Sequence, residues 1–169
     1  YKETNVYGKI AEYQTFKEYI KRDWMVLDNN TSLLELKHFI AKNEVVFAKP
    51  NHGDQGHGVI KLSINDMSMI EMLMQEAQNN SFVIEGVVKN DECISQINNT
   101  SLNTIRAVTL INKDGSTRIL SIILRVGKLG SHVDNWGSGG VGYNFDLNTG
   151  ICVDYGRDKL NRPYTHHPD

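Results

Sequence analysis

The stretch Val45–Leu62, with the sequence VVFAKPNHGDQGHGVIKL, constrains the fold of this chain more than any other. Two apolar runs rich in β-branched residues flank a loop that contains Gly53, Gly56 and Gly58, and Lys49 closes the first run. We therefore predict a strand, a glycine-rich loop and a second strand. This order differs from Walker and dinucleotide-binding loops, which lie between a strand and a helix.

Two interpretations of this loop remain open. Backbone N–H groups of a glycine loop can approach phosphate oxygens closely because no side chains intervene, and Lys49 would add a fixed positive charge. His57, inside the loop, could donate to a phosphate or remain a solvated loop histidine. A surface hairpin with a long tip explains the three glycines equally well.

The length and charge of the chain exclude several classes of protein. A chain of 169 residues predicts one domain, or a domain with a small appendage. The net charge of -2 and the lack of a basic run argue against nucleic acid and anionic membranes as partners. Cys93 and Cys152 match no metal-ligand spacing, which predicts free thiols in a reducing compartment. Without a leader or a long apolar run, we expect a cytoplasmic protein that does not insert into membranes.

Apolar periodicity predicts an α+β fold dominated by antiparallel strand pairs. Helices are expected over Lys9–Arg22, over Ser32 to about Asn43 with a Ser32–Glu35 capping box, and over Asp66–Gln78 with Met69 and its apolar neighbours inward. Further strands are expected over Ser81–Val88, Thr104–Ile111, Thr117–Val126, Tyr143–Leu147 and Ile151–Tyr155, with a turn at 90–92 and a long loop at 127–142. Glu85 interrupts an otherwise apolar strand, so it needs a partner or a place at a strand end facing a cleft.

The spacing of Glu85, Val88 and Glu92 behind the glycine loop resembles the ATP-grasp superfamily. The strings SLNTIR and VDNWGSGG and the final HHPD resemble its sugar-transfer-associated family, which is found with polysaccharide-biosynthesis machinery. The resemblance runs from about Lys9 to the end of the chain. It implies an ATP-grasp-like fold of antiparallel sheets flanked by helices, with a glycine-loop subdomain over residues 9–88 and a sheet subdomain over residues 89–169.

The resemblance also implies which residues bind ATP and substrate. Lys49 would contact the α-phosphate side, and the loop from Gly53 through Gly56 and His57 to Gly58 would cover the β- and γ-phosphates. Glu85 and the backbone of Val87 and Val88 would read adenine, and Glu92, or less readily Asp91, would bind the ribose. Arg106 and Arg125 would be catalytic residues that face phosphate or a substrate carboxylate, although either could be an ordinary solvent-facing strand residue. Asn135, Gly139 and Gly140 would border the substrate.

The resemblance is incomplete at the metal site. ATP-grasp enzymes hold two Mg²⁺ ions through an acidic residue and a Glu-x-Asn, but no glutamate follows Glu92 in this sequence. We therefore assign no metal ligand, expect the Mg²⁺ ligands beyond Asp169, and expect a truncated fragment that is inactive by itself.

The family implies an ATP-dependent ligase that activates a carboxylate donor as an acyl phosphate and transfers it to an amine or a sugar hydroxyl, in polysaccharide or cell-envelope glycan biosynthesis. A small-molecule kinase and a non-catalytic nucleotide- or glycan-binding module remain alternatives.

Overall fold

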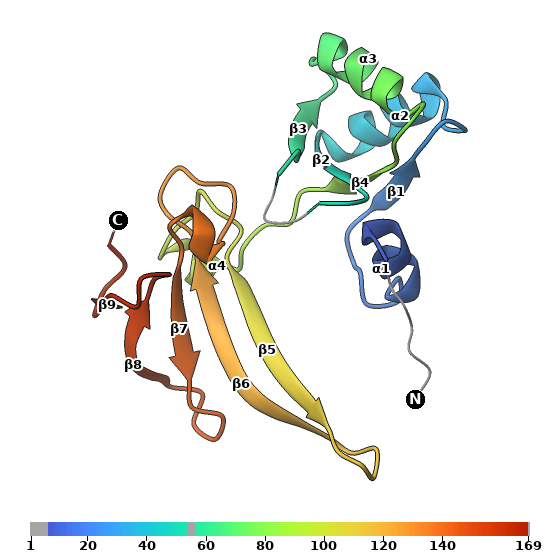
Figure 1. Cartoon of the computed structure of the whole chain (residues 1–169). Coiled ribbons are helices and arrows are strands. Elements are labelled where there is room, and N and C mark those ends of the chain that lie inside the picture. The colour runs from blue at the N-terminus through green and yellow to red at the C-terminus, as the bar shows by residue number, and fades with distance from the viewer. Residues whose placement is uncertain (1–6, 54–56, 169) are drawn as a thin grey trace. The chain divides into compact units, whose positions relative to one another are not determined.

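The structure is a computed structural model that describes residues 7–53 and 57–168. The chain forms two compact units, Tyr1–Val88 and Lys89–Asp169. Each unit holds one antiparallel sheet, with the strand order β1-β4-β2-β3 in the first and β5-β6-β7-β8-β9 in the second (Figure 1). The predicted α+β class with antiparallel sheets is confirmed.

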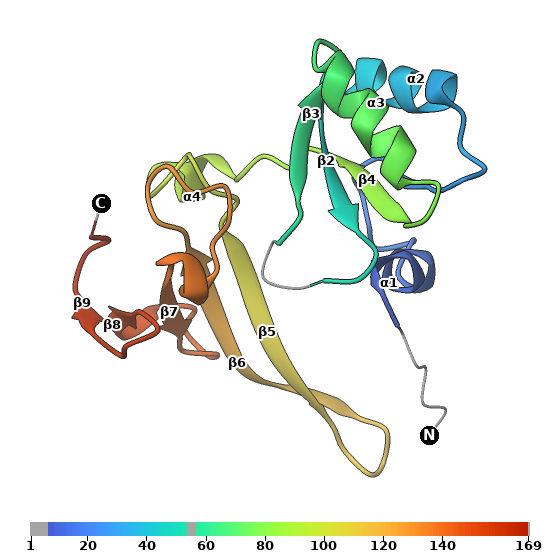
Figure 2. The ribbon, with the colours of Figure 1, turned by 45° about the horizontal axis from the view of Figure 1, so that its top comes forward.

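The first unit is a four-stranded sheet with helices on both faces. Its elements are α1 (Lys9–Thr15), β1 (Trp24–Leu27), α2 (Leu33–Asn43), β2 (Val45–Pro50), β3 (Ile60–Ser63), α3 (Met67–Glu76) and β4 (Phe82–Gly86). One face carries Ala48 and Ile84, which form a buried core with α2 and α3. Because side chains alternate along a strand, Lys49 and Glu85 lie on the opposite face. Helix α1 lies on that side of the sheet (Figures 1 and 2).

The capping box at the start of α2 is confirmed. The Ser32 hydroxyl accepts a hydrogen bond from the Glu35 backbone N–H at 3.2 Å, and the Glu35 carboxylate accepts one from the Ser32 backbone N–H at 2.8 Å. Two N–H groups that the helix cannot satisfy internally are thus paired. Leu36 and Ile40 are buried in the core, so the helix that begins at this cap also packs against the sheet.

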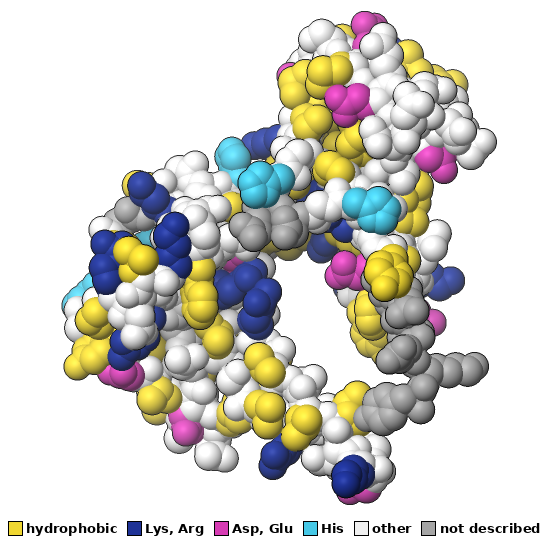
Figure 3. Space-filling model, in the orientation of Figure 1, with side chains coloured by type: hydrophobic (Ala, Val, Ile, Leu, Met, Phe, Trp, Pro, Cys, Tyr) yellow, Lys and Arg dark blue, Asp and Glu magenta, His cyan; other side chains and the backbone are white. Residues whose placement is uncertain are grey.

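The second unit consists mainly of a five-stranded meander. Its elements are α4 (Glu92–Ser95), β5 (Thr104–Ile111), β6 (Thr117–Val126), the 3-10 helix η1 (Trp136–Ser138), β7 (Val141–Phe145), β8 (Cys152–Arg157) and β9 (Pro163–Tyr164). The bounds of β5 and β6 are those predicted. Exposed apolar side chains, among them Ile105, Ile111 and Ile119, run along this hairpin (Figure 3).

Some predicted elements were wrong in extent. Helix α1 ends at Thr15 and not at Arg22, and Tyr19 N–H instead bonds to the Phe16 carbonyl in a turn. Phe16 and Tyr19 are exposed, so the apolar face expected beyond Thr15 has no core against which to pack. Met69 is also exposed rather than inward.

Four short elements were missed: β1, α4, η1 and β9. Strand β1 has only four residues and gives too short a pattern to recognise. A helical turn, α4, replaces the turn predicted at 90–92, because the Asp91 carboxylate accepts a hydrogen bond from Cys93 N–H at 3.0 Å and caps it.

Candidate functional site

The described part of the glycine loop is joined to the start of α1. Lys9 Nζ donates to the Gly53 carbonyl at 2.7 Å, and Lys9 N–H donates to the Asn51 carbonyl at 2.9 Å. Gly53 and Gly58 have φ values of 133° and 71°, which favour glycine. Gly56 lies outside the described residues. Lys9 was missed as a loop contact because 44 residues separate it from Gly53.

Glu85 is the buried centre of an ion cluster, which we call the Glu85 cluster: Tyr13, Arg22, Lys49 and Glu85. Its Oε1 forms an ion pair with Lys49 Nζ. Its Oε2 accepts hydrogen bonds from Arg22 Nε at 2.7 Å and from the Tyr13 hydroxyl. Arg22 Nη2 also donates to the Tyr13 hydroxyl oxygen at 2.5 Å. The partner that sequence reasoning required for Glu85 is therefore a set of three donors.

Sheet register and helix placement bring these four groups together. Lys49 and Glu85 come from the neighbouring strands β2 and β4, and both lie on the face opposite α2 and α3. Tyr13 comes from α1, and Arg22 lies between α1 and β1. The Trp24 ring packs edge-on against Tyr13, with ring centroids 5.3 Å apart. Tyr13 and Arg22 were missed because an amphipathic helix and a lone arginine carry no sign of such a role.

The electrostatics keep Glu85 ionised and Tyr13 protonated at neutral pH. Burial by itself would raise the pKa of Glu85, but the hydrogen bond and charge of Lys49, with Tyr13 and Arg22, lower that pKa below its ordinary value of 4.5. Burial and the neighbouring Glu85 carboxylate raise the pKa of Tyr13 to about 12. Two cations and one anion give the Glu85 cluster a net positive charge of one.

The Glu85 carboxylate retains limited capacity to bind a further donor. A carboxylate offers about four lone-pair positions, and three are used by Tyr13, Arg22 and Lys49. One position is therefore left for a donor such as an exocyclic amine. Val87 and Val88, which follow β4, are 42% and 37% exposed and available to a ligand. The adenine-binding role of these residues stays a prediction.

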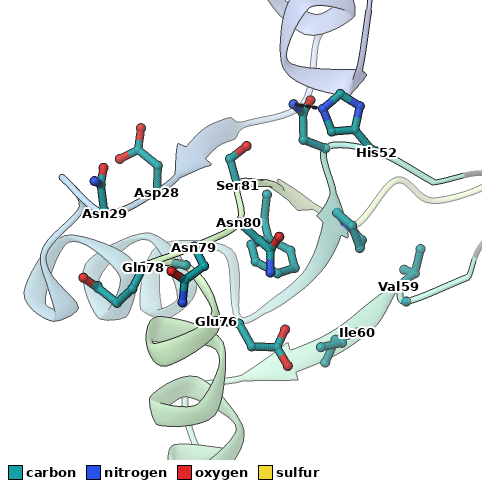
Figure 4. A pocket seen from close by; sticks show the side chains of 15 residues that line it. Asp28, Asn29, His52, Val59, Ile60, Glu76, Gln78, Asn79, Asn80 and Ser81 are labelled. Atoms are coloured by element: carbon teal, nitrogen blue, oxygen red, sulfur yellow. Dashed lines mark hydrogen bonds between the residues drawn. The ribbon is translucent and has the colours of Figure 1, made fainter.

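A pocket of about 750 Å³ opens at one end of the first sheet (Figure 4). Pro50 and Phe82 contribute from strand ends, Glu76 from the last residue of α3, and Gln78 from the segment that follows it. The lining contains carboxylates and carboxamides but neither lysine nor arginine, and Phe82 belongs to the core on the α2–α3 face. No residue of the Glu85 cluster lines the pocket, whereas His52 and Gly58 of the glycine loop do.

In the second unit, the register places Arg125 and Arg106 on one face of the sheet. Arg125 Nη2 forms an ion pair with Asp134 Oδ1 at 2.9 Å and donates to Thr104 Oγ1 at 3.0 Å, and the Thr104 hydroxyl donates to Asp134. Asp134 is buried and balances the charge of Arg125. Arg106 is exposed and makes no hydrogen bond or ion pair among the described residues.

The other predicted site residues of this unit take part in local backbone structure or lie on the surface. Glu92 is the exposed first residue of α4. The Asn135 carbonyl accepts hydrogen bonds from Ser138 and Gly140 N–H at 2.9 and 3.0 Å, and Gly139 has a φ of 94°. A Cβ on Gly140 would collide with the Asp134 carbonyl oxygen. Their roles beside a ribose or a substrate stay predictions.

The described residues contain no group of three His, Cys, Asp or Glu side chains placed to hold a metal ion. Among the described helices, none has the length and apolarity needed to cross a bilayer.

Comparison with known structures and families identifies the fold. The chain is similar to the D-alanine-D-alanine ligase from Coxiella burnetii with a TM-score of 0.50 and 6% sequence identity, and the match covers 94% of this chain and 46% of the ligase chain. At this identity the likeness concerns the fold alone, and the chain spans less than half of that enzyme. No curated protein matches the chain significantly.

The family model of the sugar-transfer associated ATP-grasp proteins matches residues 6–169. The chain belongs to this family, as the resemblance predicted. Membership in an ATP-grasp family implies that the protein binds ATP.

Proposed function

We propose that this chain is the ATP-binding part of an ATP-dependent ligase and that Lys49 and the glycine loop bind the triphosphate. The observation that carries this proposal is the placement of Lys49. It lies on the sheet face opposite α2 and α3, keeps 28% of its side chain exposed, and is held by Glu85. Lys9, bonded to Gly53, adds a second lysine at the loop, so two cations can meet the phosphate oxygens.

The proposed reaction has two steps. A carboxylate oxygen of the donor attacks the γ-phosphorus of ATP and displaces ADP, which gives an acyl phosphate. An amine or a sugar hydroxyl then attacks the acyl carbon and displaces phosphate. Lysines near the phosphates would offset the negative charge as the phosphoryl group moves. In the second unit, Arg106 is the better candidate to bind an anionic group, because Arg125 is already paired with Asp134. The association of the family with sugar transfer favours an acceptor in polysaccharide or cell-envelope glycan biosynthesis.

Mg²⁺ is the usual companion of ATP in phosphoryl transfer. The described residues do not fit a protein-held Mg²⁺ site, because they bring no three acidic or imidazole groups together. We therefore assign no metal ligand.

Isothermal titration calorimetry with ATP, with and without Mg²⁺, tests the nucleotide site. Lys49→Ala should raise the dissociation constant at least about tenfold, the scale of one charged hydrogen bond. The matched control is Lys37→Ala, which removes a lysine from α2, on the other side of the sheet, and should leave the affinity unchanged. Equal ATP affinity of Lys49→Ala and the unmutated protein would remove Lys49 from the site.

A trapping experiment separates the ligase from its alternatives. Hydroxylamine converts an acyl phosphate into a hydroxamate but does not react in this way with the phosphate ester made by a kinase. ATP-dependent hydroxamate formation from a donor carboxylate would support the ligase. Phosphate transfer to a hydroxyl without hydroxamate would support the kinase. ATP binding without turnover, in a protein that also contains the Glu-x-Asn metal ligands, would support the binding module.

A further inference from the structure

We propose that Arg22 is a positioning residue that allows Lys49 to leave Glu85 and bind a nucleotide phosphate. This inference rests on the ATP binding proposed above and adds to it a coupling between the Glu85 cluster and the phosphates. Arg22 itself would not touch the nucleotide.

The two cations of the Glu85 cluster bind different oxygens of the same carboxylate. Lys49 pairs with Oε1, whereas Arg22 donates to Oε2 at 2.7 Å. Glu85 is only 5% exposed, and a buried carboxylate without a cation is strongly unfavourable. If Lys49 turns to a phosphate, Arg22 and Tyr13 remain on Oε2, so Glu85 stays paired.

The two cations also differ in how firmly they are held. Arg22 Nη2 donates to the Tyr13 hydroxyl at 2.5 Å, and the guanidinium lies 5.5 Å from the centroid of the Tyr13 ring. Tyr13 is fixed in turn by the edge-on Trp24 ring. Among the residues that the structure describes, the Lys49 ammonium pairs with Glu85 alone, and a lysine is a point charge on a flexible stem. Lys49 is therefore the cation that can move, and Arg22 is the one that remains.

Loss of Arg22 should consequently weaken ATP binding indirectly. Without Arg22, Lys49 is the sole cation on Glu85, and taking it away for a phosphate leaves a buried carboxylate with only Tyr13 as donor. The penalty exists only while position 85 carries a negative charge. If Glu85 is replaced by Gln, Lys49 is no longer tethered and Arg22 should cease to matter.

A double-mutant cycle tests this coupling by calorimetric titration with ATP. The four proteins are the unmutated chain, Arg22→Met, Glu85→Gln and the double variant. We expect Arg22→Met to weaken ATP binding about tenfold when residue 85 is Glu, but less than about threefold when residue 85 is Gln. Such a departure from additivity marks direct coupling. Arg22→Lys, which keeps the charge, should restore most of the affinity. Lys42→Met, which breaks the exposed Lys42–Asp23 pair of the same unit, should have no effect.

The outcomes separate the two proposals. If the unmutated protein does not bind ATP, the proposed nucleotide site fails, and this inference fails with it. If it binds ATP and Arg22→Met has no effect, or weakens binding equally in both backgrounds, the nucleotide site stands and the role assigned to Arg22 is wrong. Urea unfolding of each variant tests whether the chain is folded. If Arg22→Met does not fold, Arg22→Lys takes its place in the ATP titration.

Discussion

Replacing Glu85 by Gln should destabilise the first unit strongly, because it removes the only anion of the Glu85 cluster. Gln has the shape of Glu and can still accept hydrogen bonds, but it carries no charge. Arg22 and Lys49 would then be two neighbouring cations without a counter-ion. Their mutual repulsion and incomplete hydration would oppose folding.

The size of the loss follows from the burial of the three side chains. Removing one partner of a buried ion pair costs about 3–5 kcal/mol. The side chains of Arg22 and Lys49 keep 30% and 28% of their exposure, so water can hydrate part of each released cation. We therefore expect a loss of about 2–3 kcal/mol in the free energy of unfolding of this unit.

The two tryptophans make the assay specific, because Trp24 lies in the first unit and Trp136 in the second. In a Trp136→Phe background, fluorescence during urea unfolding reports the unit that contains Glu85. Asp23→Asn, which breaks an exposed ion pair in the same unit, is the matched control and should change the midpoint little. If Glu85→Gln lowers the stability no more than Asp23→Asn does, the reasoning about the buried cluster is refuted.

The pH dependence gives a second readout of the same perturbation. The pKa of Glu85 is lower in the folded protein than its ordinary value of 4.5, so its contribution to stability is present above about pH 4.5. That contribution is lost as the pH falls through the lowered pKa. The stability difference between the unmutated protein and Glu85→Gln should thus shrink below pH 4.5, and a constant difference would assign it to packing rather than charge.

Two further predictions concern the cap of α2 and the ribose. Ser32→Ala removes the hydrogen-bond acceptor for Glu35 N–H and should cost about 1 kcal/mol in the same Trp24 unfolding assay, whereas an unchanged midpoint would show that the capping box adds nothing. Glu92→Gln should raise the dissociation constant for ATP about tenfold through the ribose hydroxyls. Equal binding of ATP and 2′,3′-dideoxy-ATP by the unmutated protein would contradict that role.

The sequence predicted correctly the elements whose ends are determined by neighbouring residues. The hairpin of β5 and β6 has a turn sequence between two β-branched runs, and α2 begins with a capping box, so their bounds follow from neighbouring residues. The end of α1 depends instead on whether a core exists beyond Thr15. No pattern within residues 9–22 carries that information.

The Glu85 cluster also depends on contacts between residues far apart in the chain, which the sequence does not reveal. A glutamate in a strand of apolar residues revealed that some partner must exist, because an unpaired buried carboxylate is unfavourable. The identity of the partners depends on α1 and β1 meeting β4, and Tyr13 and Arg22 are 72 and 63 residues away in the chain. The sequence therefore located the anomaly but could not name what resolves it.

Arg106 and Arg125 illustrate why residues with equivalent sequence patterns can have different surroundings. Both arginines lie on one face of the same sheet, so strand alternation alone treats them alike. Asp134, nine residues beyond Arg125, neutralises that charge and holds the guanidinium between itself and Thr104. Arg125 can therefore serve an anion only by giving up a buried aspartate, which is costly. Arg106 has no such competitor among the described residues, so of the two arginines it is the better candidate to attract a phosphate or a carboxylate.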